Sequence, residues 1–170
     1  MSVFKTVSKF LSVVAVASVG ATGAFAQDRF EGIVSVGGWN IWKDNDAKNC
    51  FMERKDDLNN VVQMGRTTDN LFDYVGVFTQ TEIGLKDGEI QEIQIVVGDH
   101  SYKSKSKSVR GKLSNGYMGR YFLYDNEQLA EDIAQQYVMS VFSGRSYALE
   151  INLDGTMRGM EAARKCMASF

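Results

Sequence analysis

Histidine occurs only once in this chain of 170 residues, at His100. Serine and cysteine hydrolases need a base beside their nucleophile, and the chain has no G-x-S-x-G elbow to present a serine. It also has no P-loop and no G-x-G-x-x-G run for nucleotide phosphates. We therefore expect a protein that is not an enzyme, with no catalytic residues and no cofactor. A hydrolase that uses His100 is kept as the alternative.

Long apolar runs are missing as well. The longest, residues 10–19, is shorter than the roughly 20 residues needed to span a bilayer. It follows Lys5 and Lys9 and precedes Ala24 and Ala26, which are small residues where a signal peptidase would cut. Residues 1–26 are therefore predicted to be a secretory signal, cleaved before Gln27. This prediction locates the protein in the periplasm, without a transmembrane span after cleavage.

An excess of positive charge is also absent. Removal of the signal would leave 17 basic and 21 acidic residues, a net charge of −4. Nucleic acids and anionic lipids attract basic surfaces, so this balance argues against a general affinity for either. Residues 27–170 are long enough for one domain with a core, and we expect a single β-rich domain.

Only two cysteines are present, Cys50 and Cys166, and both lie in the part that would be exported. Exported proteins enter an oxidising compartment in which disulfides persist. A reactive or metal-binding thiol is the alternative, but the chain has no C-x-x-C and no histidine near either cysteine. We therefore predict a Cys50–Cys166 disulfide and no metal site.

The C-terminal stretch contains a strand followed by a helix. Apolar residues alternate with polar ones at Tyr147, Leu149, Ile151 and Leu153. After Gly155, the spacing changes to three or four residues, at Met157, Met160, Ala163 and Cys166. This spacing predicts an amphipathic helix with Cys166 on its inner face. We interpret the methionines as core residues and keep a methionine-lined ligand groove as the alternative.

The N-terminal part predicts short strands around Gly37 and Gly38, followed by a turn into a strand at Cys50. The turn, residues 44–49, contains two aspartates and two asparagines and superficially resembles a calcium loop. Lys48 stands where an oxygen ligand is needed and Lys55 where the bidentate glutamate belongs. We therefore expect a plain turn here.

The central part predicts the longest strands. Residues 75–85 alternate in polarity and are followed by Asp87-Gly88, a dipeptide typical of two-residue hairpin turns. Residues 90–97 would form the returning strand. Pairing across that turn places apolar residues opposite polar ones, so we predict a bulge near Gln91.

Residues 100–112 are rich in lysine and serine and contain no acidic residue. The cations of this segment are Lys103, Lys105, Lys107, Arg110 and Lys112. If the segment is extended, Lys103, Lys105 and Lys107 lie on one face, where they could bind an anionic partner. The alternative is an edge strand whose lysines prevent pairing with other chains.

Residues 116–124 predict a strand, and Asp125 or Asn126 would cap a helix that runs to Gly144. Many strands are thus followed by a helix, a strand and a final helix. The predicted fold class is α+β, with a mainly antiparallel β sheet or sandwich, two C-terminal helices and one disulfide.

This plan resembles the invasion-associated locus B family of small exported proteins from alphaproteobacteria. The resemblance rests on the signal peptide, on the tryptophan strand from Trp39 to Trp42 before Cys50, and on residues 128–166 with their Leu153-to-Gly155 step. The chain has no proline and no further cysteine in its central section, where members of the family usually have both. The resemblance implies an envelope- or virulence-associated role and no defined catalytic residues.

The sequence therefore predicts a periplasmic, non-catalytic binding or interaction module of the cell envelope. Its partner would be an envelope protein or an anionic surface ligand, and not nucleic acid. A purely structural role in the envelope and an exported hydrolase are the alternatives.

Overall fold

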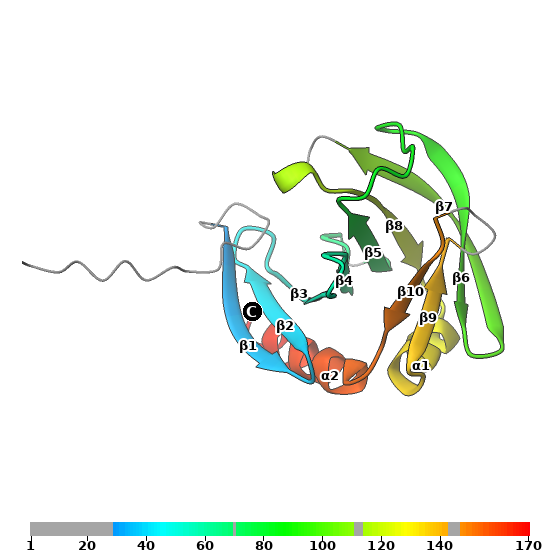
Figure 1. The fold of residues 1–170 in the computed structure, drawn as a ribbon. Helices are drawn as coiled ribbons and strands as arrows, with labels where there is room; N and C mark the ends of the chain where they lie inside the picture. Colours follow the sequence, from blue (N-terminus) through cyan, green and yellow to red (C-terminus); the bar gives the residue numbers. More distant parts are fainter. Residues whose placement is uncertain (1–28, 70, 111–113, 143–146) are drawn as a thin grey trace, which may run out of the picture.

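A computed structural model of the chain describes residues 29–69, 71–110, 114–142 and 147–170 (Figure 1). The strands are β1 (Phe30–Val36), β2 (Trp39–Asp44), β3 (Asn49–Lys55), β4 (Val61–Arg66), β5 (Asp73–Thr79), β6 (Ile90–Val97), β7 (His100–Arg110), β8 (Met118–Tyr124), β9 (Val138–Val141) and β10 (Leu149–Asn152). The helices are the short 3-10 turn η1 (Ser114–Gly116), α1 (Glu127–Gln135) and α2 (Thr156–Met167). The predicted signal, residues 1–26, lies outside the described residues.

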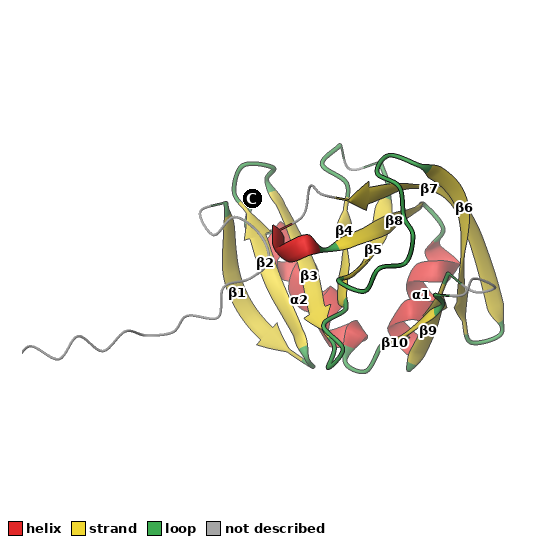
Figure 2. Cartoon of the chain, turned by 45° about the horizontal axis from the view of Figure 1, so that its top comes forward, coloured by secondary structure: helices red, strands yellow, loops and turns green. Residues whose placement is uncertain are grey.

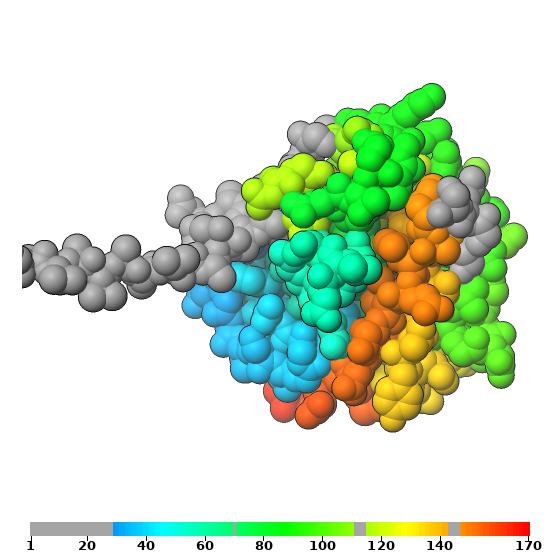
Figure 3. Space-filling model, viewed as in Figure 1, coloured from blue at the N-terminus to red at the C-terminus, as the bar shows by residue number. Residues whose placement is uncertain are grey.

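The strands form one antiparallel sheet in the order β1-β2-β3-β4-β5-β8-β7-β6-β9-β10. The predicted α+β class with a mainly antiparallel sheet is therefore confirmed, and the sheet is continuous. Only α2 is C-terminal, because β9 and β10 follow α1. Figure 1 shows the sheet strongly curled. The space-filling view from the same side shows that atoms fill the space that the ribbons leave open (Figure 3).

Both helices pack on the same face of the sheet, which we call the inner face (Figure 2). Leu129 and Ile133 of α1 and Cys166 of α2 belong to one core cluster with the inner-facing residues of the strands. α2 runs close to β2 and β3, because a Cβ on Gly159 would lie 2.9 Å from Met52 and 3.2 Å from Trp39. Met157, expected on the inner side of α2, is exposed.

Two glycines bring the ends of the curled sheet together. Gly37 lies in the β1–β2 turn and Gly155 precedes α2, and both have positive φ, +60° and +74°. A Cβ on Gly155 would lie 2.2 Å from the Gly37 carbonyl oxygen. Arg54 reinforces the junction by donating to the Asp154 carbonyl at 2.8 Å. The β1–β2 hairpin is thus fixed against the start of α2.

The predicted hairpin across Asp87-Gly88 is wrong. β5 ends at Thr79 and pairs with β4 and β8, whereas β6 pairs with β7 and β9. Asp87 and Gly88 do form a turn, closed by a hydrogen bond from Glu89 N to the Lys86 carbonyl at 3.2 Å. That turn connects β6 to a loop rather than to a paired strand.

The tight hairpin of this region lies at the other end of β6. Val97 pairs with His100, so Gly98 and Asp99 form the connecting turn. Pairing of β6 with β7 is regular from Ile90 to Val97, and the bulge predicted near Gln91 is therefore also wrong.

The predicted helix to Gly144 is only partly correct. Asn126 is the N-cap, as expected, but α1 ends at Gln135, and Val138–Val141 form β9. Apolar residues at 138, 139 and 141 are compatible with either structure, and pairing of β9 with both β6 and β10 decides for a strand. Gly144 lies outside the described residues.

Candidate functional site

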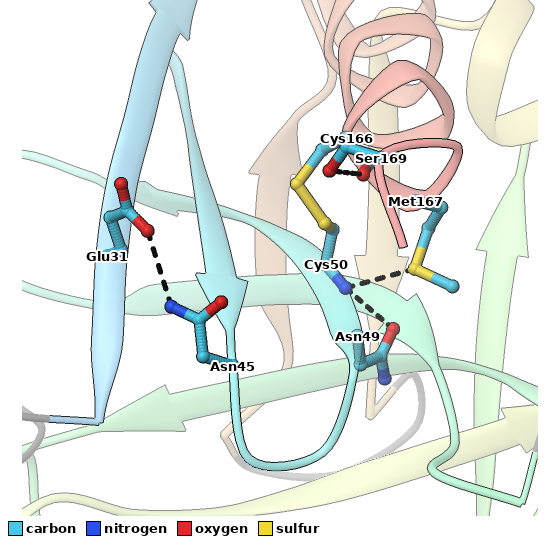
Figure 4. Close-up of a disulfide and its surroundings, with 7 residues drawn as sticks. All are labelled: Glu31, Asn45, Asn49, Cys50, Cys166, Met167 and Ser169. Atoms are coloured by element: carbon cyan, nitrogen blue, oxygen red, sulfur yellow. Dashed lines mark hydrogen bonds between the residues drawn. A yellow bond between two sulfur atoms is a disulfide. The ribbon is translucent and has the colours of Figure 1, made fainter.

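The two cysteines form the predicted disulfide, which joins β3 to α2 with a Cα–Cα distance of 6.1 Å. Figure 4 shows the Met167 thioether directed at the backbone amide of Cys50, with an N–S distance of 3.1 Å. At the same end of α2, the Ser169 hydroxyl donates to the Cys166 carbonyl at 2.6 Å. These contacts and the burial of both cysteines indicate a structural bond.

β7 displays Lys103, Lys105 and Lys107 on the outer face of the sheet, opposite the helices, and all three are exposed. Residues 100–107 pair with β6 alone, whereas residues 108–110 pair with β8. The lysine-rich half of β7 is therefore an edge among the described strands. Lys103 lies 3.6 Å from the exposed Glu92 carboxylate, a pair that contributes little.

The remaining cations of this segment do not extend the lysine row. Arg110 has the parity of the inner-facing residues of β7, and its guanidinium pairs with the Glu82 carboxylate at 2.6 Å. It also donates to the Leu85 carbonyl at 3.0 Å and so holds the loop between β5 and β6. Lys112 lies outside the described residues. The candidate surface is consequently Lys103, Lys105 and Lys107, which we call the lysine row.

An aromatic cluster covers the neighbouring outer face of β3, β5 and β8. The Tyr121 ring contacts Tyr74 and Phe78 edge to face, with centroids 5.5 and 5.1 Å apart. The cluster sits close to the backbone, because a Cβ on Gly76 would lie 2.8 Å from Tyr121. Burial raises the pKa of the Tyr74 hydroxyl, as it does that of Tyr121. Both phenols thus stay neutral hydrogen-bond donors at neutral pH.

An open cleft of about 870 Å³ joins the lysine row to this cluster. Phe51, Tyr74, Tyr121 and Leu123 line it on one side, and Lys105 and Lys107 on another. Its other basic residues form ion pairs: Arg29 with Asp44, and Arg66 with Asp73. Neither Lys105 nor Lys107 has an ion-pair or hydrogen-bond partner among the residues that the structure describes. These two ammonium groups are available to a ligand in the cleft.

His100 contacts a residue that lies 32 positions further along the chain. Its Nδ1 lies 2.7 Å from Asp132 of α1, and the same Asp132 oxygen accepts from Tyr102 at 2.5 Å. Gln128 donates to the other carboxylate oxygen at 2.9 Å. Burial alone would raise the pKa of Asp132, but these hydrogen bonds outweigh it and hold that pKa below its usual range. Burial, assisted by Asp132, raises the pKa of Tyr102 to about 12.

Asp132→Asn is expected to lower the free energy of unfolding at neutral pH by about 1–3 kcal/mol, since charge-assisted hydrogen bonds are lost. The folded pKa of Asp132 lies below the unfolded value, so its contribution is present above about pH 4 and disappears as the pH falls through the folded pKa. Urea unfolding of both proteins across acidic pH checks this. A difference in unfolding free energy between the wild type and Asp132→Asn that stays constant down to the acid transition would contradict this prediction.

The turn at residues 44–49 is closed by Asp44, whose carboxylate accepts the backbone N–H groups of Asp46 and Ala47 at 3.1 and 3.0 Å. Within residues 29–69, 71–110, 114–142 and 147–170, no group of three or more histidine, cysteine or carboxylate side chains is placed to hold a metal ion. In that same part of the chain, neither helix has the length and apolar character needed to cross a membrane.

Sequence reasoning located the lysines but missed the residues around them. Phe51 and Tyr121 fall in predicted strands, whereas Tyr74 precedes the strand predicted for residues 75–85. No spacing rule links the three, because they belong to three different strands. Asp132 lies within the predicted helix, 32 residues after His100, so no local pattern connects the two. Comparison of the chain with protein-family models, curated proteins and solved structures found no match in any of the three.

Proposed function

We propose that the protein is a non-catalytic binding module of the cell envelope, exported to the periplasm, that binds an anionic partner in the outer cleft. The partner would be an envelope protein or an anionic surface ligand. One observation carries the proposal: Lys105 and Lys107 lie beside an aromatic surface in an open cleft, without partners among the described residues. Such a cleft offers cations for charge and ring faces for apolar contact. Membership of the invasion-associated locus B family is part of this proposal.

Changing Lys103, Lys105 and Lys107 together to serine is expected to weaken binding of an acidic peptide, poly-glutamate, about tenfold at low salt. Three ammonium groups beside the cleft attract carboxylates, and salt screens that attraction. Fluorescence anisotropy with labelled peptide, at low and at high salt, measures the effect. The matched control changes Lys55, Arg158 and Lys165, exposed cations away from the cleft, and should bind as the wild type does.

The same experiment separates binding from protection of the sheet edge. If the lysine row only prevents pairing of the β7 edge, its serine variant should self-associate, and peptide binding should be absent from wild type and variants alike. Equal binding by the lysine-row variant and the control variant would contradict the proposed site.

A hydrolase that uses His100 is the second candidate. The contact that favours it is the one from Asp132, which fixes the His100 ring through Nδ1 and leaves Nε2 on a side chain that is 57% exposed. An orienting carboxylate and a histidine are two parts of a catalytic triad. This mechanism would also require a nucleophilic group beside Nε2. Either this chain or a partner bound to it would have to supply that group.

A further inference from the structure

A second cavity, of about 440 Å³, lies on the inner side of the sheet between α1, α2 and the ends of β3, β4, β5 and β8. Its size falls within the range of small-molecule sites. The apolar part of its wall consists mainly of Met52, Met64, Met160, Met167, Ala130 and Ala163. The cavity is thus separate from the lysine row.

Methionine is concentrated in this wall, which holds four of the eight methionines of the chain. Met52 and Met64 are buried and lie directly opposite each other on β3 and β4. Met160 and Met167 are seven residues apart on α2, so nearly two turns place them on the same side of the helix. Unbranched thioether side chains adapt their shape to an apolar guest, as they do at many promiscuous binding surfaces.

The rim of the cavity is positive. Arg66 pairs with Asp73, with an Nε–O distance of 3.0 Å, and Arg164 of α2 adds a second guanidinium. Arg164 is exposed, and its side chain has no ion-pair or hydrogen-bond partner within the part of the chain that the structure describes. Two guanidinium groups against one carboxylate leave a net positive charge at the entrance.

Tyr124 adds an unpaired polar group to the same wall. Its side chain is nine-tenths buried, at 9% exposure, and its hydroxyl has no hydrogen-bond partner among the described residues. Burial foremost raises the pKa of this phenol, assisted by Asp73, while the charges of Arg164 and Arg66 act to lower it. Tyr124, Arg66 and Arg164 line the same cavity, so this hydroxyl can donate to a carboxylate that is held at the rim.

We propose that this cavity binds a single-chain amphiphile with a carboxylate head group, of the fatty-acid class. The apolar chain lies among the four methionines, between α1 and α2. The carboxylate lies at the rim, where Arg164 pairs with it and the Tyr124 hydroxyl donates to it. A carboxylate fits the rim because it balances the net positive charge and accepts from the Arg164 guanidinium and the Tyr124 hydroxyl.

Calorimetric titration of the purified protein with laurate, below its micellar concentration, tests the proposal. The wild type is expected to bind one laurate, and to bind dodecanol, which lacks the carboxylate, about tenfold more weakly. Arg164→Gln should weaken laurate about tenfold and leave dodecanol unchanged, and Tyr124→Phe should weaken laurate several-fold. The control Lys165→Gln removes an adjacent exposed charge of α2 that does not line the cavity, and should bind as the wild type does.

Filling the cavity tests where the chain of the ligand lies. Ala163→Leu, from α2, and Ala130→Leu, from α1, each add apolar volume to the wall and should abolish binding of both ligands. If circular dichroism shows that one of them does not fold, the other decides. Absence of saturable laurate binding by the wild type, or unchanged binding by a folded cavity-filling variant, would overturn the proposal.

Discussion

Replacing Cys50 and Cys166 together with alanine is expected to lower the free energy of unfolding by about 2–5 kcal/mol. The disulfide spans 116 residues of sequence and ties α2, the last element of the chain, to the third strand of the sheet. Closing a loop of that length restricts the unfolded chain by roughly 4–5 kcal/mol in the chain-entropy account. Both cysteines are buried, so the double variant also loses packing.

Denaturant unfolding of three samples checks this prediction: the wild type, the wild type with a thiol reductant, and the double alanine variant. The reduced wild type and the variant should both unfold at lower denaturant than the oxidised wild type. Hydrogen exchange should increase most in α2, because the disulfide is its covalent link to β3. An unchanged unfolding midpoint in the double variant would show that packing of α2 alone holds it in place.

The C-terminal unit was predictable because its information is local. An alternating segment followed by a helical period identifies β10 and α2, and Gly155 marks the boundary between them. The disulfide followed from chemistry rather than pattern, since the only two cysteines of a chain predicted to be exported have only each other to pair with. The exposed Met157 was misplaced because the buried side of α2 is formed by Thr156, Gly159 and Cys166, and Gly159 has no side chain to mark that side in the sequence.

The order of the central strands was not predictable in the same way. Asp87-Gly88 is a genuine turn, yet after β4 the second strand that pairs with β5 is β8, which lies about 40 residues further along the chain. Residues 80–88 leave the sheet because their groups find other partners. Arg110 binds Glu82, and Ser108 exchanges backbone hydrogen bonds with Gly88 and Glu89. Long-range pairing of this kind leaves no mark in local alternation.

The candidate site was likewise predictable only where its residues follow a local pattern. The lysine row was visible because every second residue of an extended segment faces one side. The aromatic side of the cleft was not visible, because Phe51, Tyr74 and Tyr121 meet only once three strands have assembled. The interpretation of the methionines of α2 as core residues is correct for Met160, which packs against the core, and wrong for the exposed Met157. The cavity that Met160 lines could not be predicted, because its wall also includes residues of α1 and of four strands.

Arg120→Met is expected to lower the free energy of unfolding by about 3 kcal/mol or more. Arg120 lies on the inner face of β8 and is 1% exposed, yet it carries a charge. Its guanidinium donates to the carbonyls of Ser106 and Glu89 at 3.0 and 3.2 Å and lies 3.5 Å from the Glu89 carboxylate. Methionine preserves most of the volume but leaves these acceptors without their donor.

The unfolding free energy lost in Arg120→Met should exceed the loss when an exposed arginine that also pairs with a carboxylate is replaced. Arg66→Met is the matched control, because Arg66 also pairs with a carboxylate across neighbouring strands, but its side chain is 53% exposed. An exposed pair of this kind contributes at most about 1 kcal/mol. Urea unfolding of both variants compares the two, and equal losses would contradict a special role for the buried guanidinium.

A double substitution separates the charge from the packing. If the penalty of Arg120→Met comes from a Glu89 carboxylate left without its cation, Glu89→Gln in the same chain should recover part of it. Glu89 is only partly buried, so water solvates some of the stranded charge, and the recovery should be about 1 kcal/mol. The remainder belongs to the Ser106 and Glu89 carbonyls, which fix β7 and the start of β6 to β8. If Glu89→Gln recovers none of the lost unfolding free energy, the whole loss comes from the hydrogen bonds to the two backbone carbonyls. Arg120 would then stabilise the fold through those hydrogen bonds and not through its ion pair.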